Sequence, residues 1–303
     1  MSAVTVSVPT AELAAAIGPL EGAEIFVWEM EAPSPRSDID IVVPPYMSLH
    51  TALPLLDGLR TRLVQAQSIG YDGVAELLPA GVVFANAATV HEASTAELAV
   101  ALTLAAQRQL PGYVLAQGEG RWAPTFAASL ADRRVLLLGY GGVGKAIAER
   151  LRPFEVELTA VAARARDEDG VPVHGVDELP ALLPEAEIVV LSLPGGEATR
   201  HIVDDAFLGA LPDGALVVNV GRGPLIDTDA LVAHAGRIRA ALDVTDPEPL
   251  PRDHPLWSAP GILIVPHVGG ASTAMLPRLV ALLRRQIAHL VAGEEPENVV
   301  LRT

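Results

Sequence analysis

A glycine-rich turn constrains the fold of this chain more than any other feature of its sequence. The turn reads Gly139-Tyr140-Gly141-Gly142-Val143-Gly144 and lies between an apolar strand, residues 135–138, and a predicted helix. In this setting Gly139 permits a tight turn, Gly141 lets the backbone approach a phosphate, and Gly144 lets the helix pack closely on the strand. The helix N-terminus adds N–H donors and a positive dipole end. The pattern predicts a dinucleotide-binding domain; a turn of this kind without a ligand is the alternative.

Short apolar runs alternate with helical stretches along the chain. We predict strands at residues 4–8, 24–28, 39–43, 62–65 and 82–84, and a second series at 134–138, 157–161, 188–191, 216–220, 238–242 and 262–265. We expect a long helix over 96–109, a loop over 111–130 and a last helix over 274–291. This alternation is typical of parallel sheets covered by helices, so the predicted fold class is α/β with two doubly wound parallel sheets.

The composition limits the partners that the chain can have. Its formal net charge is −16, which disfavours nucleic acid and anionic membrane surfaces, so we expect neither as a partner. The chain has no cysteine, which excludes disulfides and thiolate chemistry, and we expect no metal site. The N-terminus lacks the features of a signal peptide, and no apolar run reaches the roughly 18 residues that span a bilayer. We therefore expect a cytoplasmic protein.

The end of the second strand of the dinucleotide domain indicates which cofactor is bound. NAD-binding domains usually carry Asp or Glu there, about 20 residues past the glycines, to hold the ribose 2′-hydroxyl. Here no acid ends the strand, and Ala163, Arg164 and Arg166 follow it. Arginines suit a 2′-phosphate, so NADP(H) is the preferred cofactor and NAD(H) is possible. The alternative is a pair of exposed loop arginines beside the acids at 167–169.

Three further segments place charged or titratable residues beside glycines or prolines, at or just past the ends of predicted strands. Arg222 lies between two glycines, Glu248 between two prolines, and His267 just before Gly269 and Gly270. Ligands of doubly wound sheets bind at the carboxyl ends of strands, which makes all three candidates for a site. Taken singly, each has a structural alternative: a turn arginine, a polar loop acid and a structural histidine.

The order and spacing of these segments are more specific. The glycine turn is followed by Asn219-Val220-Gly221-Arg222-Gly223, by Asp243-Val244 with Glu248-Pro249, and by Pro266-His267-Val268-Gly269-Gly270. With these motifs the chain resembles the D-isomer-specific 2-hydroxyacid dehydrogenase family, in particular its glyoxylate/hydroxypyruvate reductase-like members, over nearly its whole length.

The resemblance implies a mechanism and a set of roles. Arg222 would hold the substrate carboxylate and polarise the 2-oxo oxygen, while His267 would be the acid for ketone reduction and the base for alcohol oxidation. Glu248 would pair with His267 and raise its pKa, which keeps a proton available near neutral pH. The reaction would be hydride transfer between a nicotinamide and a small 2-oxo or 2-hydroxy acid.

The same resemblance implies the binding residues. Those expected to contact the cofactor are Tyr140, Gly141, Gly142, Val143, Ala163, Arg164, Arg166, Leu193, Pro194, Thr199, Val220, Gly221, Arg222, Asp243, His267 and Gly269, with Asp243 near the nicotinamide carboxamide. Those expected to contact the substrate are Ile69 and Gly70, through their backbone. Tyr46 and Met47 are candidates for its side chain, and the alternative is that these two are packing residues.

Domain organisation and assembly follow from the resemblance as well. Residues 1–97 and 272–303 would form a flavodoxin-like substrate domain, and residues 98–271 a Rossmann cofactor domain inserted into it. We expect a homodimer, in which the segment at 118–122 reaches the partner.

Several functions stay open at this point. The substrate could be glyoxylate, hydroxypyruvate, or a larger or aromatic 2-oxo acid. Formate and phosphite dehydrogenases share the architecture, but the formate branch typically has Gln where this chain has Glu248. A corepressor-like protein that senses NAD(P) through the same fold is the alternative from another class.

Overall fold

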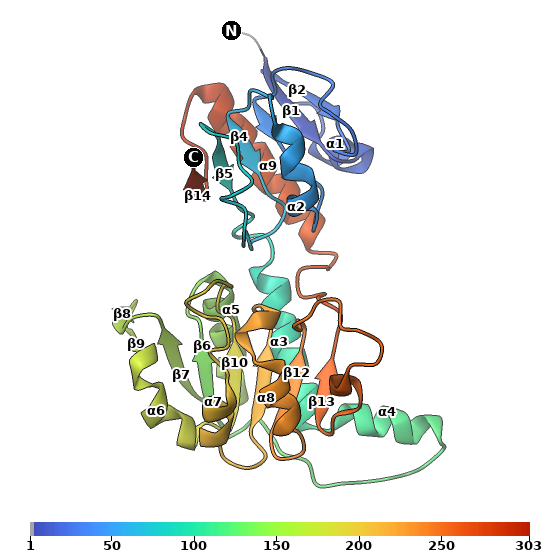
Figure 1. Cartoon of the computed structure of the whole chain (residues 1–303), viewed down its shortest axis with the longest axis vertical. Coiled ribbons are helices and arrows are strands. Elements are labelled where there is room, and N and C mark those ends of the chain that lie inside the picture. The colour runs from blue at the N-terminus through green and yellow to red at the C-terminus, as the bar shows by residue number, and fades with distance from the viewer. Residues whose placement is uncertain (1–2) are drawn as a thin grey trace. The chain divides into compact units, whose positions relative to one another are not determined.

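The computed structural model describes residues 3–303, and contacts between residues divide them into two compact units (Figure 1). The first unit comprises the chain up to His91 together with Ser272–Thr303, and the second is Glu92–Ala271. The division falls at the start of helix α3 (Glu92–Gln107), whereas the boundary expected at residue 97 lies inside that helix.

The first unit is built on a six-stranded sheet with the strand order β14-β5-β4-β3-β1-β2. Its strands are β1 (Val4–Val8), β2 (Ala23–Val27), β3 (Ile41–Val42), β4 (Leu63–Gln65), β5 (Val83–Ala85) and β14 (Val299–Arg302). All pairs are parallel except β14 with β5, which are antiparallel. The helices are α1 (Ala11–Ile17), α2 (Leu49–Ala52), η1 (Leu53–Leu56) and α9 (Met275–Ala292).

Consecutive residues of these strands enter different cores, because side chains of a strand alternate between its two faces. Ile41 and Leu63 pack in a cluster with α9 residues such as Leu282. The next residues along the same strands, Val42 and Val64, pack in a second cluster on the other face. Both faces of the sheet are therefore covered, which explains why its strands read as continuous apolar runs.

The second unit contains an eight-stranded sheet with the order β13-β12-β11-β10-β6-β7-β9-β8. Its strands are β6 (Arg134–Leu138), β7 (Glu157–Ala162), β8 (Arg166–Glu168), β9 (Val171–Gly175), β10 (Ile188–Leu191), β11 (Leu216–Asn219), β12 (Arg239–Leu242) and β13 (Ile262–Ile264). Only the pair β8–β9 is antiparallel in this sheet. The order reverses between β6 and β10, the switch point at which such sheets bind their ligands.

Helices and short 3-10 turns connect these strands. They are α3, α4 (Leu110–Gly118), α5 (Gly142–Leu151), η2 (Arg152–Phe154), η3 (Val176–Glu178), α6 (Leu179–Leu182), η4 (Leu183–Glu185), α7 (Asp205–Ala210), η5 (Gly223–Leu225), α8 (Thr228–Ala233) and η6 (Pro255–Ser258). Leu136 and Leu138 pack in one core cluster, and Val135 and Leu137 pack in another, so this sheet too is buried on both faces.

The α/β class and all six strands predicted for the dinucleotide domain are confirmed, but part of the predicted loop is wrong. Residues 111–118 of that stretch belong to α4, which begins at Leu110, directly after Gln109 has left the helical conformation with φ 56°. Proline fits the first turn of a helix, because the N–H group that it lacks would have no partner there. Pro111 is therefore compatible with the start of α4. The strands β8, β9 and β14 were not predicted.

The structure also gives Gly144 a testable role. A Cβ added at Gly144 would lie 2.0 Å from the carbonyl oxygen of Gly139, so Gly144→Ala must displace the backbone of the turn. We expect the free energy of unfolding to fall by about 1–3 kcal/mol, measured by chemical denaturation. Gly209→Ala is the matched control, because a Cβ in that helix meets no atom within 4 Å in the described structure. Equal stability of the two variants would contradict this packing.

Candidate active site

The charged residues singled out from the sequence gather at one edge of the second unit's sheet. Strands β11, β12 and β13 are parallel neighbours, and their last residues are Asn219, Leu242 and Ile264. The segments that follow these strand ends carry the predicted arginine, glutamate and histidine. Parallel pairing therefore brings together residues that lie up to 45 positions apart in the sequence, 222 to 267.

His267 and Glu248 form a close pair. The Nδ1 atom of His267 donates a hydrogen bond to Oε1 of Glu248 over 2.5 Å. The two side chains are about one third exposed, so the pair is sheltered but reachable from solvent. His267 has the left-handed φ of 51°, an uncommon conformation for a residue with a side chain. Nδ1 is committed to Glu248, and Nε2 is the nitrogen left for other chemistry.

The pair stabilises the charged form of both partners. The hydrogen bond to Glu248 raises the pKa of His267 above its ordinary value, and this effect outweighs burial and the charge of Arg222, which lower it. Burial raises the pKa of Glu248, but the hydrogen bond and the charge of His267, with smaller contributions from the Thr245 backbone and Arg222, lower it, and the net pKa is lowered. The imidazole therefore keeps its proton to higher pH than a solvent-exposed histidine.

Asp243 fixes the loop that carries His267. Its carboxylate accepts hydrogen bonds from the backbone N–H groups of Val268 and Gly269, at 2.7 and 2.9 Å. Its backbone oxygen accepts one from the N–H of His267 at 2.7 Å. The side chain is almost fully buried, and burial raises the pKa of Asp243 although the two N–H donors oppose this. The contact expected with the cofactor stays a prediction for Asp243.

Arg222 lies on a turn that is held by Asn219. The Asn219 side chain donates to the carbonyl oxygen of Arg222 at 2.8 Å and accepts from the N–H of Gly221 at 3.0 Å. A Cβ added at Gly223 would lie 1.8 Å from the carbonyl oxygen of Thr245, so only glycine fits where this turn meets the Glu248 loop. The sequence placed Asn219 within a motif but gave it no role, because its hydrogen-bond partners are visible only in the folded turn.

The glycine turn has the features of a phosphate site. Among the described residues no side chain caps helix α5, although its first turn leaves backbone N–H groups unpaired within the helix. Gly141 and Gly142 are exposed, Val143 is half-buried and Tyr140 is buried. Gly139 meets the backbone of Ser192, whose hydroxyl donates to the Gly139 oxygen at 2.9 Å. The open, uncapped N-terminus fits the pyrophosphate of a dinucleotide.

The other expected cofactor residues follow the ends of β7, β10 and β11. After β7, Ala163, Arg164 and Arg166 are exposed, and Arg166 Nη2 donates to the carbonyl oxygen of Tyr140 at 3.3 Å. After β10, Thr199 closes its loop by donating from Oγ1 to the carbonyl oxygen of Pro194 at 2.8 Å, while Leu193 is buried. Val220 and Gly221 are buried after β11, and Gly269 is buried after β13.

The expected substrate residues belong to the first unit. Tyr46 stacks on His91 with 5.7 Å between ring centroids, and Met47 is exposed with a left-handed φ of 61°. Ile69 and Gly70 are half-buried in the segment after β4. The Ile69 carbonyl oxygen accepts from the side chain of Asn86 at 2.9 Å, which fixes this turn.

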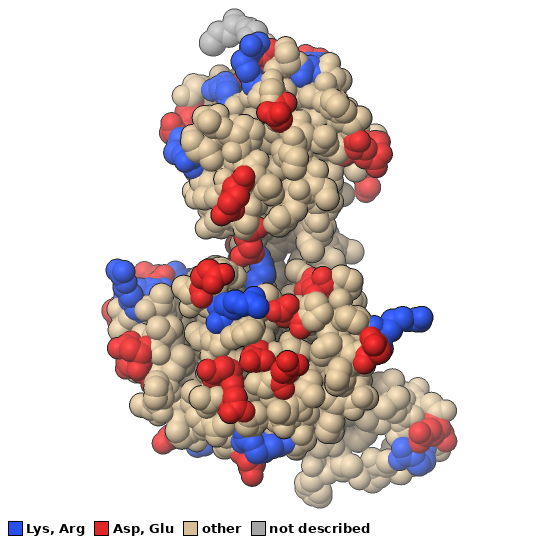
Figure 2. All heavy atoms as spheres, viewed as in Figure 1, with Lys and Arg blue, Asp and Glu red and all other residues tan. Residues whose placement is uncertain are grey.

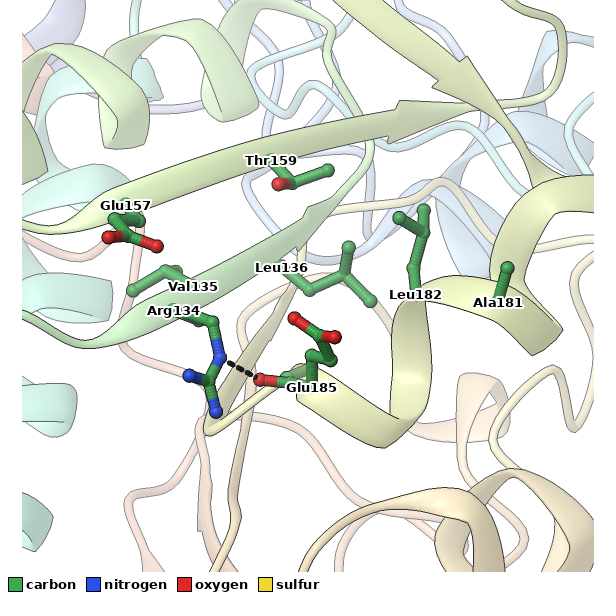
Figure 3. Close-up of a pocket in the computed structure, with 9 residues that line it drawn as sticks. Arg134, Val135, Leu136, Glu157, Thr159, Ala181, Leu182 and Glu185 are labelled. Atoms are coloured by element: carbon green, nitrogen blue, oxygen red, sulfur yellow. Dashed lines mark hydrogen bonds between the residues drawn. The ribbon is translucent and has the colours of Figure 1, made fainter.

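A separate cavity of about 370 Å³ lies elsewhere on the second unit (Figure 3). Its lining includes Arg134 and Glu157, the first residues of β6 and β7, and Arg134 donates to the Glu185 carbonyl oxygen at 2.6 Å. The cavity therefore opens at the amino ends of these strands, away from the edge with His267. On the face drawn in Figure 2, acidic and basic side chains of the described residues are interspersed, without an extended basic patch.

Membrane-crossing helices and clusters of metal ligands are both absent from the described part of the chain. No helix there is long and apolar enough to cross a membrane. Within residues 3–303 no three His, Cys, Asp or Glu side chains are grouped so that they could hold a metal ion.

Comparison with known proteins agrees with this geometry. Residues 100–269 match the family model described as D-isomer specific 2-hydroxyacid dehydrogenase, NAD binding domain. An uncharacterized protein in the proB 3′ region of Corynebacterium melassecola is 37% identical over 77% of this chain and 80% of its own length. The glyoxylate reductase/hydroxypyruvate reductase of Homo sapiens is 30% identical over 82% of each chain.

A solved structure supports the same assignment across nearly the whole chain. The D-isomer specific 2-hydroxyacid dehydrogenase from Xanthobacter autotrophicus Py2, in complex with NADPH and MES, superposes with a TM-score of 0.81 at 28% identity, covering 99% of this chain and 98% of that one. The chain belongs to the D-isomer specific 2-hydroxyacid dehydrogenase family and is an NAD(P)-dependent oxidoreductase acting on CH–OH groups.

Proposed function

We propose that this enzyme uses NADPH to reduce a small 2-oxo acid such as glyoxylate or hydroxypyruvate to its 2-hydroxy acid. The observation that carries the proposal is the His267–Glu248 pair, held with Arg222 at the carboxyl edge of the sheet. The name of the human relative and the NADPH in the Xanthobacter structure support the choice of substrate and cofactor.

Residues of the second unit suit two parts of a dinucleotide, its pyrophosphate and its 2′-phosphate. The uncapped N-terminus of α5, with Gly141, Gly142 and Val143, would bind the pyrophosphate. Arg164 and Arg166 follow β7, at the position where such domains bind the 2′-phosphate. Within the described structure the side chain of Arg164 is exposed and makes no hydrogen bond or ion pair. This favours NADP(H), with NAD(H) as a possible second cofactor.

Each charged side chain then has one task. Arg222 binds the substrate carboxylate through its planar guanidinium and polarises the 2-oxo oxygen. His267 delivers the proton from Nε2 to that oxygen, while Glu248 holds the imidazole by Nδ1 and stabilises its charge. Asp243 and Asn219 position these groups by fixing the two turns. The bound nicotinamide supplies the hydride.

The two units are proposed to divide the binding tasks. The second unit would carry the cofactor, and the first would contribute the backbone of Ile69 and Gly70 to the substrate carboxylate, with Tyr46 and Met47 at the substrate side chain. The boundary at residue 97 and the cytoplasmic location that we expect from the sequence stay predictions.

We also propose that the enzyme is a homodimer. Helix α4 extends away from the body of the second unit, and the loop after it returns at the bottom of the view (Figure 1). Val114, Leu115, Trp122 and Phe126 on this arm are all more than 60% exposed. Large exposed apolar residues that gather on one segment are typical of a surface that another protein covers.

A panel assay tests the proposed reaction. We expect NADPH to be oxidised with at least one small 2-oxo acid, and His267→Asn to lower turnover by about 10²–10⁴-fold while NADPH still binds. His234→Asn is a matched control, because His234 makes the same kind of contact with Asp205, at 2.9 Å, outside the site. NADPH binding without oxidation across the panel would favour a sensor protein, and near-normal turnover of His267→Asn would refute the role of that residue.

The pH dependence tests the pair itself. Reduction needs the protonated imidazole, so its rate should fall as the pH rises through the pKa of His267, which Glu248 raises. Glu248→Gln removes that carboxylate and should move the falling limb of the kcat/KM profile for reduction to lower pH. Asp205→Asn, at the control pair, should leave the profile in place. If the falling limb of the profile is unshifted in Glu248→Gln, the pair does not set the affinity of the His267 imidazole for its proton.

Light scattering after size exclusion tests the homodimer. The wild type should have the mass of two chains, and the double variant Trp122→Ser with Phe126→Ser should shift towards one chain, because it removes two large apolar side chains from the arm. Trp257→Ser is the control, since Trp257 is also exposed but lies outside the arm. A monomeric wild type, or an unchanged dimer in the double variant, would contradict the proposal.

A further inference from the structure

A cluster of three charged residues lies beside the glycine turn, and only one of them, Arg166, has a role in the function proposed so far. Lys145, which is the only lysine of the chain, forms an ion pair from α5 with one oxygen of Glu168. Arg166 donates from Nε to the other oxygen of Glu168 at 2.7 Å. One carboxylate therefore occupies two cations at once.

The fold places this cluster at the position where such a domain binds the adenosine ribose of a dinucleotide. Arg166 and Glu168 are the first and last residues of β8, which pairs antiparallel with β9 just after the end of β7. Arg166 also donates to the carbonyl oxygen of Tyr140, which ties the hairpin to the glycine turn. The ribose 2′ position of a bound dinucleotide lies at the end of the second strand of such a domain, which is β7 here.

The cluster is open to a ligand. The side chains of Lys145 and Arg166 are about 40% exposed, and that of Glu168 is 24% exposed. Exposed ion pairs contribute little to stability, so exchanging one anion for another on these cations has a small cost. A phosphate monoester carries more charge than a carboxylate and has three acceptor oxygens, so it is the stronger partner for two neighbouring cations.

We propose that Lys145 and Arg166 form a two-cation site for the 2′-phosphate of NADP(H), and that Glu168 occupies both cations until the phosphate displaces it. Glu168 is thus an internal competitor that lowers the affinity for the phosphorylated cofactor. The inference rests on the proposed preference for NADP(H), and it adds Lys145 and Glu168 to the residues that determine this preference.

A binding experiment without any 2-oxo acid tests the inference. NADPH and NADH are titrated separately into the wild type and each variant, and binding is followed by nicotinamide fluorescence. Lys145→Met should raise the Kd for NADPH about fivefold, and Glu168→Gln should lower it about threefold, with the Kd for NADH changed less than about twofold in both. Arg150→Met is the matched control, because Arg150 is a cation on the same helix that bonds the Ala146 carbonyl oxygen instead.

The outcomes separate this inference from the reaction proposed above. An unchanged Kd for NADPH in Lys145→Met, or an equal loss of NADPH and NADH, would overturn the role of Lys145. Weaker NADPH binding in Glu168→Gln would make Glu168 a support for the cations and overturn its role as a competitor. Protein that shows the expected shifts but reduces no 2-oxo acid would contradict only the proposed reaction. A thermal melting curve of each variant serves as the control for retention of the fold.

Discussion

Parallel pairing of β11, β12 and β13 is the constraint on which the rest of the site depends. It places the ends of three strands side by side, so the turns that follow must share one edge of the sheet. The turns are then locked to each other: Gly223 lies against the carbonyl oxygen of Thr245, and Asp243 holds the loop that carries His267. The positions of Arg222, Glu248 and His267 therefore follow from contacts that fix the backbone of the turns on which they lie.

This arrangement resolves the conflict between an acidic chain and an anionic substrate. With a net charge of −16 the protein as a whole repels anions, so binding depends on local cations. Arg222 is one such cation, and the imidazolium of His267, which Glu248 stabilises at 2.5 Å, is a second. Each of these two residues is held by a neighbour: Asn219 fixes the backbone of the Arg222 turn, and Glu248 holds the imidazole of His267.

The sequence predicted the parallel strands well because strands buried on both faces leave uninterrupted apolar runs. The strands β8 and β9 lack that signal, because β8 reads Arg-Asp-Glu and β9 is interrupted by Pro172. Strand β14 does contain a short apolar run, but it pairs with a strand more than 200 residues away. Helix α4 was missed because glycines such as Gly112 and Gly118 in this stretch are typical of a loop. The roles of Asn219 and Lys145 could not be predicted, since each depends on a partner that only the folded chain brings near. The motif positions Arg222, Glu248 and His267 were expected, and their assembly at one edge is what the fold adds.

Glu248 keeps a proton on His267, and the pKa of that imidazole measures this effect directly. Titration of the histidine ring nitrogens by NMR, with His267→Asn to assign the signal, follows this group without substrate. The account predicts a pKa above the ordinary histidine value of about 6.5, which falls when Glu248 is replaced by Gln. A His267 pKa at or below the ordinary value in the wild type, or one that does not change in Glu248→Gln, would contradict it.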